Sequence, residues 1–267
     1  MNNAQDDTNN DETVTLSDLH CLITRPEAQG ASLIRALRPY TTSISHIPLI
    51  RIQPAVLGHY DSEAHLSTTK LIYTSPNAVQ HCPTEYFRSH ANASFFAVGK
   101  KTADSLHHKL SGLSIPAAVE VPLNESSEGL LQLPALSQVA QDTITIVRGV
   151  GGRELLATQL RERGAKINYL EVYQREIIHN DPQMWYDQWK KIQINCIVVT
   201  SLEILEQIFS QAPQEIILNL QQCTWLVASE RIAQSAEQYD VPYSQINICG
   251  GASDQHIVAT IQQLTGR

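Results

Sequence analysis

The segment KLIYTSPNAVQHC, residues 70–82, decides the fold class of this chain. It begins with a short apolar run, continues with the polar pair Thr74-Ser75, and ends with residues spaced as on one face of a helix. The same order recurs in residues 20–37, 95–110, 144–160, 196–209 and 225–239. Short β-branched runs suit strands that are buried on both faces. Their alternation with helical segments predicts an α/β fold, in which helices cover a parallel sheet.

These strand-helix segments also follow one order twice along the chain. Four features recur in it: an arginine after a strand (Arg25, Arg148), a Thr-Ser pair (Thr74-Ser75, Thr200-Ser201), a helix start at Gly99 or Ser229, and a Ser-acid pair (Ser127-Glu128, Ser253-Asp254). The repeated order indicates an internal duplication, and chance similarity among strand-helix units is the alternative. The extended segments 43–54 and 166–178 occupy matching places, so we expect the chain to cross between two domains there.

Composition narrows the class of protein. A length of 267 residues fits two domains, and 42% apolar residues suffice for packed cores. No apolar run approaches the roughly 20 residues of a membrane span. The start, MNNAQDDTNNDET, has no features of a signal peptide, and residues 1–13 are expected to form a disordered acidic tail. The formal net charge is −8, and the four acidic residues of the tail account for half of it. The rest of the chain is therefore still mildly acidic, and no basic face that would bind nucleic acid is expected.

The cysteines and histidines show no metal-binding spacing. Five cysteines occur without a CxxC pair, which is typical of buried free thiols in a reducing compartment. The ten histidines form no HExxH motif. We therefore expect a cytoplasmic protein without a metal ion.

The predicted strand ends suit an anionic ligand. In parallel sheets, ligands gather at the carboxyl ends of the strands, where helix N-termini present free N–H groups and a partial positive charge. An array of such helix starts suits a ligand with several carboxylates or phosphates. The alternative is that Ser, Thr and Gly at these places only cap helices.

The glycine-rich segment RGVGGRE, residues 148–154, follows a predicted strand. It lacks the third glycine of a dinucleotide fingerprint, because Glu154 stands there, and it has no phosphate-binding lysine. No cofactor is therefore expected. The segment is interpreted as a turn whose backbone N–H groups approach an anion beside Arg148 and Arg153. A turn with solvated arginines is the alternative.

Eight segments in order resemble the uroporphyrinogen-III synthase family. They are LITRPEAQ (22–29), IYTSPNAV (72–79), FAVGKKTADSL (96–106), VRGVGGRELLATQLRERGA (147–165), VYQR (172–175), VVTS (198–201), VASERIAQSA (227–236) and GGASDQHIVATI (250–261). The resemblance implies two doubly wound, flavodoxin-like parallel-sheet domains joined by a two-stranded linker, with the active site in the cleft between them. Domain one would be 14–46 plus 178–267, domain two 53–168, and the linker strands 47–52 and 169–177.

The resemblance also implies the reaction. The substrate would be hydroxymethylbilane, a linear tetrapyrrole with eight carboxylates, which would be cyclised to uroporphyrinogen III in heme biosynthesis. Ring D would be inverted and water lost, without a cofactor, by a monomer that receives substrate from hydroxymethylbilane synthase. A non-catalytic two-domain protein that binds an anionic small molecule is the alternative, and a nucleotide-dependent oxidoreductase is disfavoured by the broken glycine pattern.

Roles for individual residues follow from the same resemblance. Tyr173 would be catalytic, since a phenol can donate a proton at neutral pH; packing is the alternative role for a tyrosine. Ser229 stands where the family often has glycine, as at Gly99. The expected substrate-binding residues are Arg25, Thr74, Ser75, Asn77, Gly99, Thr102, Arg148, Gly149, Gly152, Arg153, Ser201 and Ser229.

Overall fold

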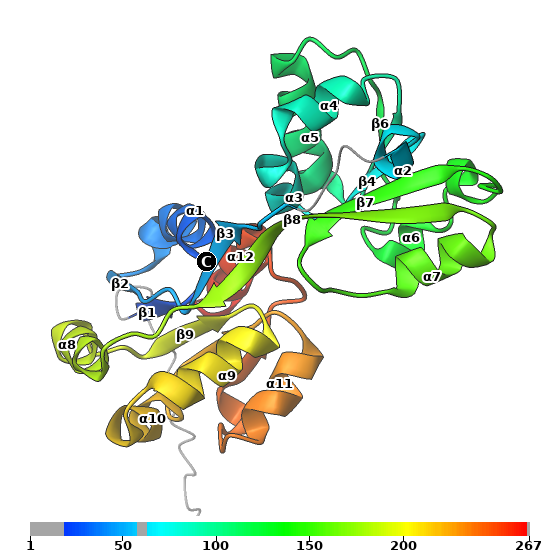
Figure 1. Ribbon diagram of the computed structural model, residues 1–267. Helices are drawn as coiled ribbons and strands as arrows, with labels where there is room; N and C mark the ends of the chain where they lie inside the picture. The colour runs from blue at the N-terminus through cyan, green and yellow to red at the C-terminus, as the bar shows by residue number, and fades with distance from the viewer. Residues whose placement is uncertain (1–18, 58–62, 266–267) are drawn as a thin grey trace, which may run out of the picture. The chain divides into compact units, whose positions relative to one another are not determined.

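The computed structural model describes residues 19–57 and 63–265 (Figure 1). The expected tail, 1–13, lies outside these residues. The chain divides into two compact units. Unit one takes the chain up to Arg51 and again from Ile177, and unit two is Ile52–Glu176. Each unit contains one sheet with helices, so the predicted α/β class is confirmed.

Unit one has a five-stranded sheet in the order β11-β10-β9-β1-β2. Its strands are β1 His20–Ile23, β2 Ser43–His46, β9 Cys196–Val199, β10 Thr224–Val227 and β11 Ile246–Ile248. All four pairings are parallel, and β1 pairs with β9 through Cys21 opposite Cys196. The helices are α1 Glu27–Leu37, α8 Pro182–Ile192, α9 Leu202–Gln211, α10 Gln214–Leu220, α11 Glu230–Glu237 and α12 Asp254–Leu264.

The strands of unit one are buried on both faces, as their apolar runs predict. Successive side chains of a strand point to opposite faces. In β9, Ile197 and Val199 pack with α8, α9, α10 and α11, whereas Cys196 and Val198 pack with α1 and α12. Two helical layers therefore cover one sheet, which is the doubly wound arrangement.

Unit two has a six-stranded sheet in the order β3-β8-β7-β4-β5-β6. Its strands are β3 Ile50–Pro54, β4 Lys70–Tyr73, β5 Ser94–Ala97, β6 Val119–Glu120, β7 Thr143–Gly149 and β8 Lys166–Ile177. The helices are α2 Glu63–Leu66, α3 Pro76–His81, α4 Thr84–Ser89, α5 Lys100–Gly112, α6 Ser127–Leu130 and α7 Leu155–Glu162. The chain passes between the units within β3 and at the end of β8.

Unit two repeats the doubly wound pattern. In β4, Leu71 and Tyr73 pack with α3, α4 and α5, and Ile72 packs with α6 and α7 on the other face. Parallel pairings join β4 to β5 and to β7, and β7 to β8. The strand that ends before Thr74-Ser75 therefore lies at the centre of the sheet, where its carboxyl end adjoins those of β5 and β7.

Serine side chains begin several of the helices. Ser75 and Ser201 accept hydrogen bonds from the N–H groups of Ala78 (3.1 Å) and Ile204 (3.2 Å). Such bonds satisfy N–H groups that have no partner within the helix. At α6 the cap is Ser126, and Ser127 and Glu128, which were expected to precede the helix, are its first two residues. No helix in the described ranges is long and apolar enough to cross a membrane.

Candidate functional site

Tyr173 lies on β8, at an irregularity in the pairing of β8 with β7. Arg148 stands opposite Glu171, but the next residue of β7, Gly149, stands opposite Tyr173, so Val172 is an extra residue. A bulge of this kind turns the following side chain to the other face. The Tyr173 ring is consequently 5% exposed and packs in the same core as Leu170 and Val172.

The Tyr173 hydroxyl lies at the start of α3. Its oxygen is 3.2 Å from Oγ of Ser75, the residue that caps this helix. The pair thus forms a chain of hydrogen bonds that leads from the phenol to the Ala78 N–H. Asn77 is half-buried in the first turn of α3, and the His81 ring lies 6.1 Å from the Tyr173 ring. Burial lowers the pKa of His81 below its usual value.

Gly149 makes room for the Tyr173 ring. A β-carbon at Gly149 would lie 2.6 Å from Cζ of Tyr173, far inside a normal contact. The Val150 N–H donates to the Tyr173 carbonyl at 2.7 Å, which holds the two segments together beyond the bulge. Thr74 belongs to the same edge, because its N–H and Oγ1 both lie within hydrogen-bond distance of the Val147 carbonyl. Tyr173, Ser75, Thr74 and Gly149 are therefore brought together by unit two.

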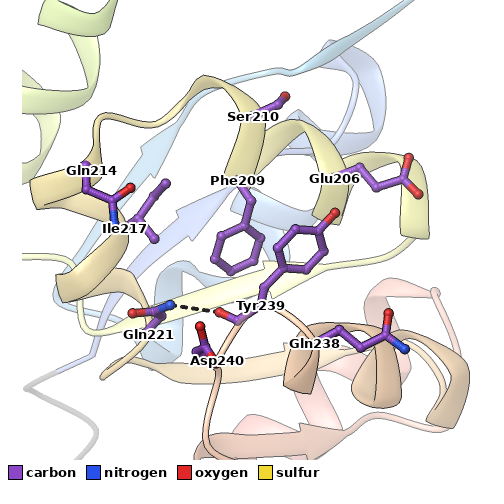
Figure 2. Close-up of a pocket in the computed structure, with 9 residues that line it drawn as sticks. All are labelled: Glu206, Phe209, Ser210, Gln214, Ile217, Gln221, Gln238, Tyr239 and Asp240. Atoms are coloured by element: carbon purple, nitrogen blue, oxygen red, sulfur yellow. Dashed lines mark hydrogen bonds between the residues drawn. The ribbon is translucent and has the colours of Figure 1, made fainter.

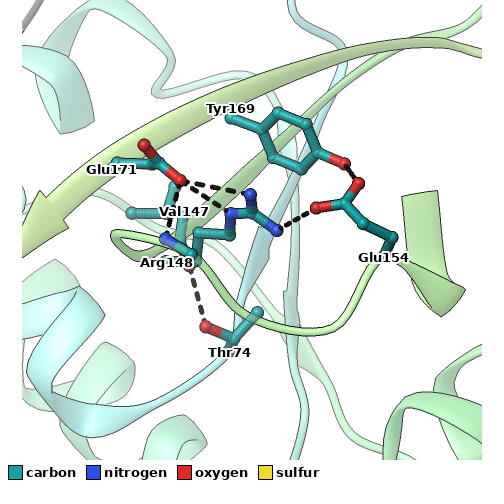
Figure 3. A network of polar contacts seen from close by, with 7 residues as sticks. Thr74, Val147, Arg148, Glu154, Tyr169 and Glu171 are labelled. Carbon is teal, nitrogen blue, oxygen red and sulfur yellow. Dashed lines mark hydrogen bonds and ion pairs between the residues drawn. The ribbon is translucent and has the colours of Figure 1, made fainter.

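Arg148 is held by carboxylates of the chain itself (Figure 3). Its Nη1 lies 2.9 Å from Glu154 Oε1, and its Nη2 and Nε lie 3.1 and 3.2 Å from Glu171 Oε1. The guanidinium also stacks over the Tyr169 ring at 3.9 Å. An arginine with two carboxylate partners offers little unshielded charge to a substrate.

The pKa of Glu154 depends on its contacts with Tyr169 and Arg148. The Tyr169 hydroxyl donates a hydrogen bond to Glu154 (Figure 3). This bond, together with Arg148, lowers the pKa of Glu154. Burial and the bond to Glu154 raise the pKa of Tyr169. Both groups are therefore held in the protonation states that their hydrogen bond requires, an ionised carboxylate and a neutral phenol.

The rest of the glycine-rich segment is open to solvent. Gly152 and Arg153 are exposed, and Gly151 and Gly152 have positive φ angles of 72° and 116°. Such angles favour glycine. The Gly151 N–H donates to Glu171 Oε1 at 3.2 Å, so this N–H already has an anionic partner.

The start of α5 also carries a carboxylate. Gly99 precedes the helix, and the Lys100 N–H donates to Glu125 Oε2 at 2.9 Å. A β-carbon at Gly99 would lie 2.4 Å from that oxygen, so a larger residue at position 99 would displace the Glu125 side chain. Thr102 is buried in the first turn of the helix. A carboxylate from the chain thus occupies a helix start at which a substrate carboxylate was expected.

Unit one holds the remaining candidates. Arg25 is 7% exposed, and its Nη1 lies 2.8 Å from Asp254 Oδ1 at the start of α12. Its Nε is buried without a hydrogen-bond partner among the described residues. Ser32 Oγ donates to the other Asp254 oxygen at 2.6 Å. Arg25 therefore joins the loop after β1 to α12.

The helix starts of unit one differ in their capping. Ser201 uses its side chain to cap α9, as Ser75 does for α3. Ser229 precedes α11 and makes no side-chain cap bond, so its hydroxyl is not committed to the helix. Ser201 and Ser229 follow the adjacent strands β9 and β10, and both lie at the carboxyl edge of that sheet.

Sequence reasoning missed the acids that pair with positive groups at the strand ends of each unit. They are Glu125, Glu154, Glu171 and Asp254. The segment NYLEVYQ, residues 168–174, carried a signal for one of these contacts. Residues two apart on a strand share a face, so Tyr169 and Glu171 were predictable as neighbours. The ion pairs themselves depend on strand register, which the sequence does not give.

Three comparisons with known proteins agree on one family. A family model described as uroporphyrinogen-III synthase HemD matches residues 31–247. The chain is 33% identical over 249 residues to uroporphyrinogen-III synthase of Escherichia coli (strain K12), covering 90% of this chain and 99% of that protein. It is 34% identical over 253 residues to the enzyme of the same name from Salmonella typhimurium, with the same coverage.

A solved structure supports the fold. The crystal structure of uroporphyrinogen-III synthetase from Helicobacter pylori matches with a TM-score of 0.61 at 14% identity, over 92% of this chain and 99% of that one. The comparisons give no support to a non-catalytic binding protein. Because the family model covers most of the chain and the sequence relatives match over nearly their whole length, the chain belongs to the uroporphyrinogen-III synthase family.

Proposed function

We propose that this enzyme cyclises hydroxymethylbilane to uroporphyrinogen III, with inversion of ring D and loss of water, in heme biosynthesis. Membership of the family and similarity along nearly the whole chain support this reaction. The proposal includes a cytoplasmic location, with which the five buried free cysteines agree, and transfer of the substrate from hydroxymethylbilane synthase.

The proposed mechanism rests on the contact between the Tyr173 and Ser75 hydroxyls. The terminal hydroxyl of the substrate must gain a proton to leave as water. Tyr173 donates this proton, and Ser75, at 3.2 Å, keeps the phenol oriented. The methylene freed of its hydroxyl bonds first to the ring D carbon that already carries the chain, the bond from that carbon to the ring C methylene then breaks, and this methylene bonds to the free terminal carbon of ring D. Ring D is thereby inverted, and the terminal carbon releases one proton, which restores the phenol. The reaction therefore balances with water as the only by-product.

Positioning supplies most of the catalysis in this proposal. The linear substrate must be folded so that its two ends meet with ring D turned over, and holding reactants in this way removes an entropic barrier. Its carboxylates bind N–H groups and hydroxyls at the helix starts beside Thr74, Asn77, Gly99, Thr102, Ser201 and Ser229. The N–H groups of Gly149 and Gly152 and the Arg153 side chain belong to the proposed set. Arg25 and Arg148 complete it with a weaker attraction, because carboxylates of the chain already pair with them.

A coupled assay tests the reaction. Porphobilinogen and a hydroxymethylbilane synthase generate the substrate, and the oxidised porphyrins are separated by isomer. Isomer III should exceed isomer I, the product of spontaneous closure in a sample without this enzyme. Isomer I alone, from protein shown to be folded, would refute the proposed function.

Tyr173→Phe tests the proposed proton donor. We expect kcat to fall by about 100-fold, within the usual range for loss of a general acid, with KM nearly unchanged. Tyr169→Phe, on the same strand, is the matched control and should keep most of the activity. Equal turnover by Tyr173→Phe and the unmodified enzyme would remove Tyr173 from the mechanism.

A further inference from the structure

Unit one contains a pocket near the amino ends of its strands, whereas the proposed substrate-binding residues lie at the carboxyl ends. The pocket has a volume of about 350 Å³ and lies between α9, α10 and the segment that follows α11 (Figure 2). Helices α9 and α11 begin at the carboxyl ends of β9 and β10, so their last turns lie at the amino edge. None of the lining residues belongs to the proposed substrate site.

Two stacked aromatic rings, Phe209 and Tyr239, line this pocket, and a third ring, Trp225, lies behind them. The Trp225 ring is fully buried, the Phe209 ring lies parallel to it at 5.7 Å, and the Tyr239 ring lies parallel to Phe209 at 4.3 Å. Tyr239 is half-buried and is the outer ring of the stack. Its carbonyl accepts a hydrogen bond from the Gln221 side chain at 2.8 Å, which fixes the segment that carries the ring (Figure 2). A rigid aromatic face is thus presented to the pocket.

The charges around this face are all negative. The lining includes the carboxylates of Glu206 and Asp240, and no lysine, arginine or histidine. Within residues 19–57 and 63–265, neither carboxylate forms an ion pair. The C-terminal ends of α9 and α11 lie here and add partial negative charge, whereas the start of α10 at Gln214 adds the opposite partial charge of one helix. A face of this kind attracts cations through the ring quadrupole and repels anions.

We propose that this pocket binds a small organic cation with a flat amidinium or guanidinium group. The planar cation stacks on the Tyr239 ring, and its N–H groups donate to Glu206 and Asp240. The volume matches the lower range of small-molecule sites, which suits a ligand of one ring. The ligand is thus opposite in charge to the polycarboxylate substrate, and the site stands whether or not the proposed reaction is correct.

Titration of the full-length protein with benzamidine, followed by backbone amide chemical shifts in NMR, tests this site. A ligand of this size should bind with a Kd of about 1 mM. We expect shifts at Phe209, Tyr239 and Asp240, and at least about ten-fold weaker binding of benzamide, the neutral analogue of nearly the same shape. Equal affinity for the two compounds, or no shifts at these residues at about 10 mM benzamidine, would overturn the proposal.

A charge-neutral variant tests the role of the carboxylates. Glu206→Gln with Asp240→Asn should weaken benzamidine binding about five-fold, since each exposed charge contributes a fraction of a kcal/mol. Asp240 has a φ of 61°, a conformation that asparagine also tolerates, so the variant should fold. Glu237→Gln, on the exposed face of α11, is the matched control and should bind as the unmodified protein does. Unchanged binding by the double variant would overturn the proposed recognition.

Discussion

Arg25 and Arg148, the two arginines of the repeated sequence pattern, differ in their surroundings. Arg148 in unit two contacts Glu154 and Glu171 and stacks on Tyr169. In unit one, the Arg25 side chain forms an ion pair with Asp254, and its Nε is buried without a hydrogen-bond partner in the described part of the chain. The repeated sequence pattern thus places the same residue type in two environments: Arg148 has partners for its side-chain nitrogens, whereas the Nε of Arg25 has none among the described residues.

This difference extends along the edge of each sheet. In unit two the chain also places Glu125 at the start of α5, where unit one has Ser229 at the start of α11 with an uncommitted hydroxyl. Unit two therefore neutralises more of its own positive groups. The comparison teaches that an arginine after a strand is not by itself an anion site, because the pairing acids come from distant parts of the fold.

Gly149→Ala should have the largest effect on activity. The residue after the arginine is Gly149 in unit two and Pro26 in unit one, and only Gly149 packs against Tyr173. The new β-carbon would lie 2.6 Å from Cζ of Tyr173 and must displace the ring. If Tyr173 is catalytic, a shift of about 1 Å lowers kcat by about 100-fold. Kinetics of isomer III formation measure this effect.

Gly112→Ala is the control for the added methyl group. A β-carbon at Gly112 meets no atom within 4 Å, and alanine suits its place at the end of α5. This variant should retain full activity. Equal activity in Gly149→Ala would show that the packing of Tyr173 on Gly149 does not matter for turnover.

Replacing each arginine by methionine tests the comparison directly. Arg148→Met leaves Glu154 and Glu171 without their cation, and the loop after β7 loses its anchor, so we expect the melting temperature to fall by about 6 °C. Arg25→Met removes one ion pair but also a buried unpartnered donor, so the fall should be about 2 °C. Calorimetry measures both, and a larger loss for Arg25→Met would reverse the comparison.

Glu125→Gln should improve substrate binding if the start of α5 holds a substrate carboxylate. The exposed Glu125 carboxylate then competes for the Lys100 N–H, and the neutral amide competes less well. We expect KM to fall about three-fold at unchanged kcat, the size of one exposed charge interaction. Glu128→Gln, exposed on α6, is the control, and an unchanged KM in Glu125→Gln would separate Glu125 from substrate binding.

Local sequence patterns predicted the fold class and many of the helix starts. The run that ends at Tyr73 and the pair Thr74-Ser75 act over a few residues, through burial on both faces and capping by a side chain. Such signals depend little on the rest of the molecule. They therefore identify β4 and the start of α3 correctly.

The surroundings of the candidate residues were not predictable in the same way. The bulge that turns Tyr173 toward Leu170 and Val172 depends on how β8 pairs with β7, which its own alternating pattern does not specify. The contact of Arg25 with Asp254 joins residues more than two hundred positions apart. Long-range pairings of this kind come from topology, so whether each candidate binds substrate remains a prediction.

The smallest expected effect concerns pH and the carboxylate that holds Arg148. The hydrogen bond from Tyr169 and the contact with Arg148 hold the pKa of Glu154 below its ordinary value of 4.5. Its stabilising contribution is therefore complete above pH 4.5 and is lost as the pH falls through the lower pKa of the folded state. Tyr169→Phe removes the main donor, so the folded-state pKa returns toward 4.5 and the melting temperature depends less on pH below that value.

The size of this change should be small, about 1 °C between pH 4.5 and 3.5, because Glu154 is exposed and solvent screens its interactions. Tyr243→Phe removes an exposed phenol from unit one and should leave the pH dependence unaltered. If Tyr169→Phe shows the same pH dependence as the unmodified protein, the Tyr169 bond does not stabilise the Glu154 carboxylate. Arg148 would then be the main group that stabilises that carboxylate, and the surroundings of Arg148 and Arg25 would differ less than their contacts indicate.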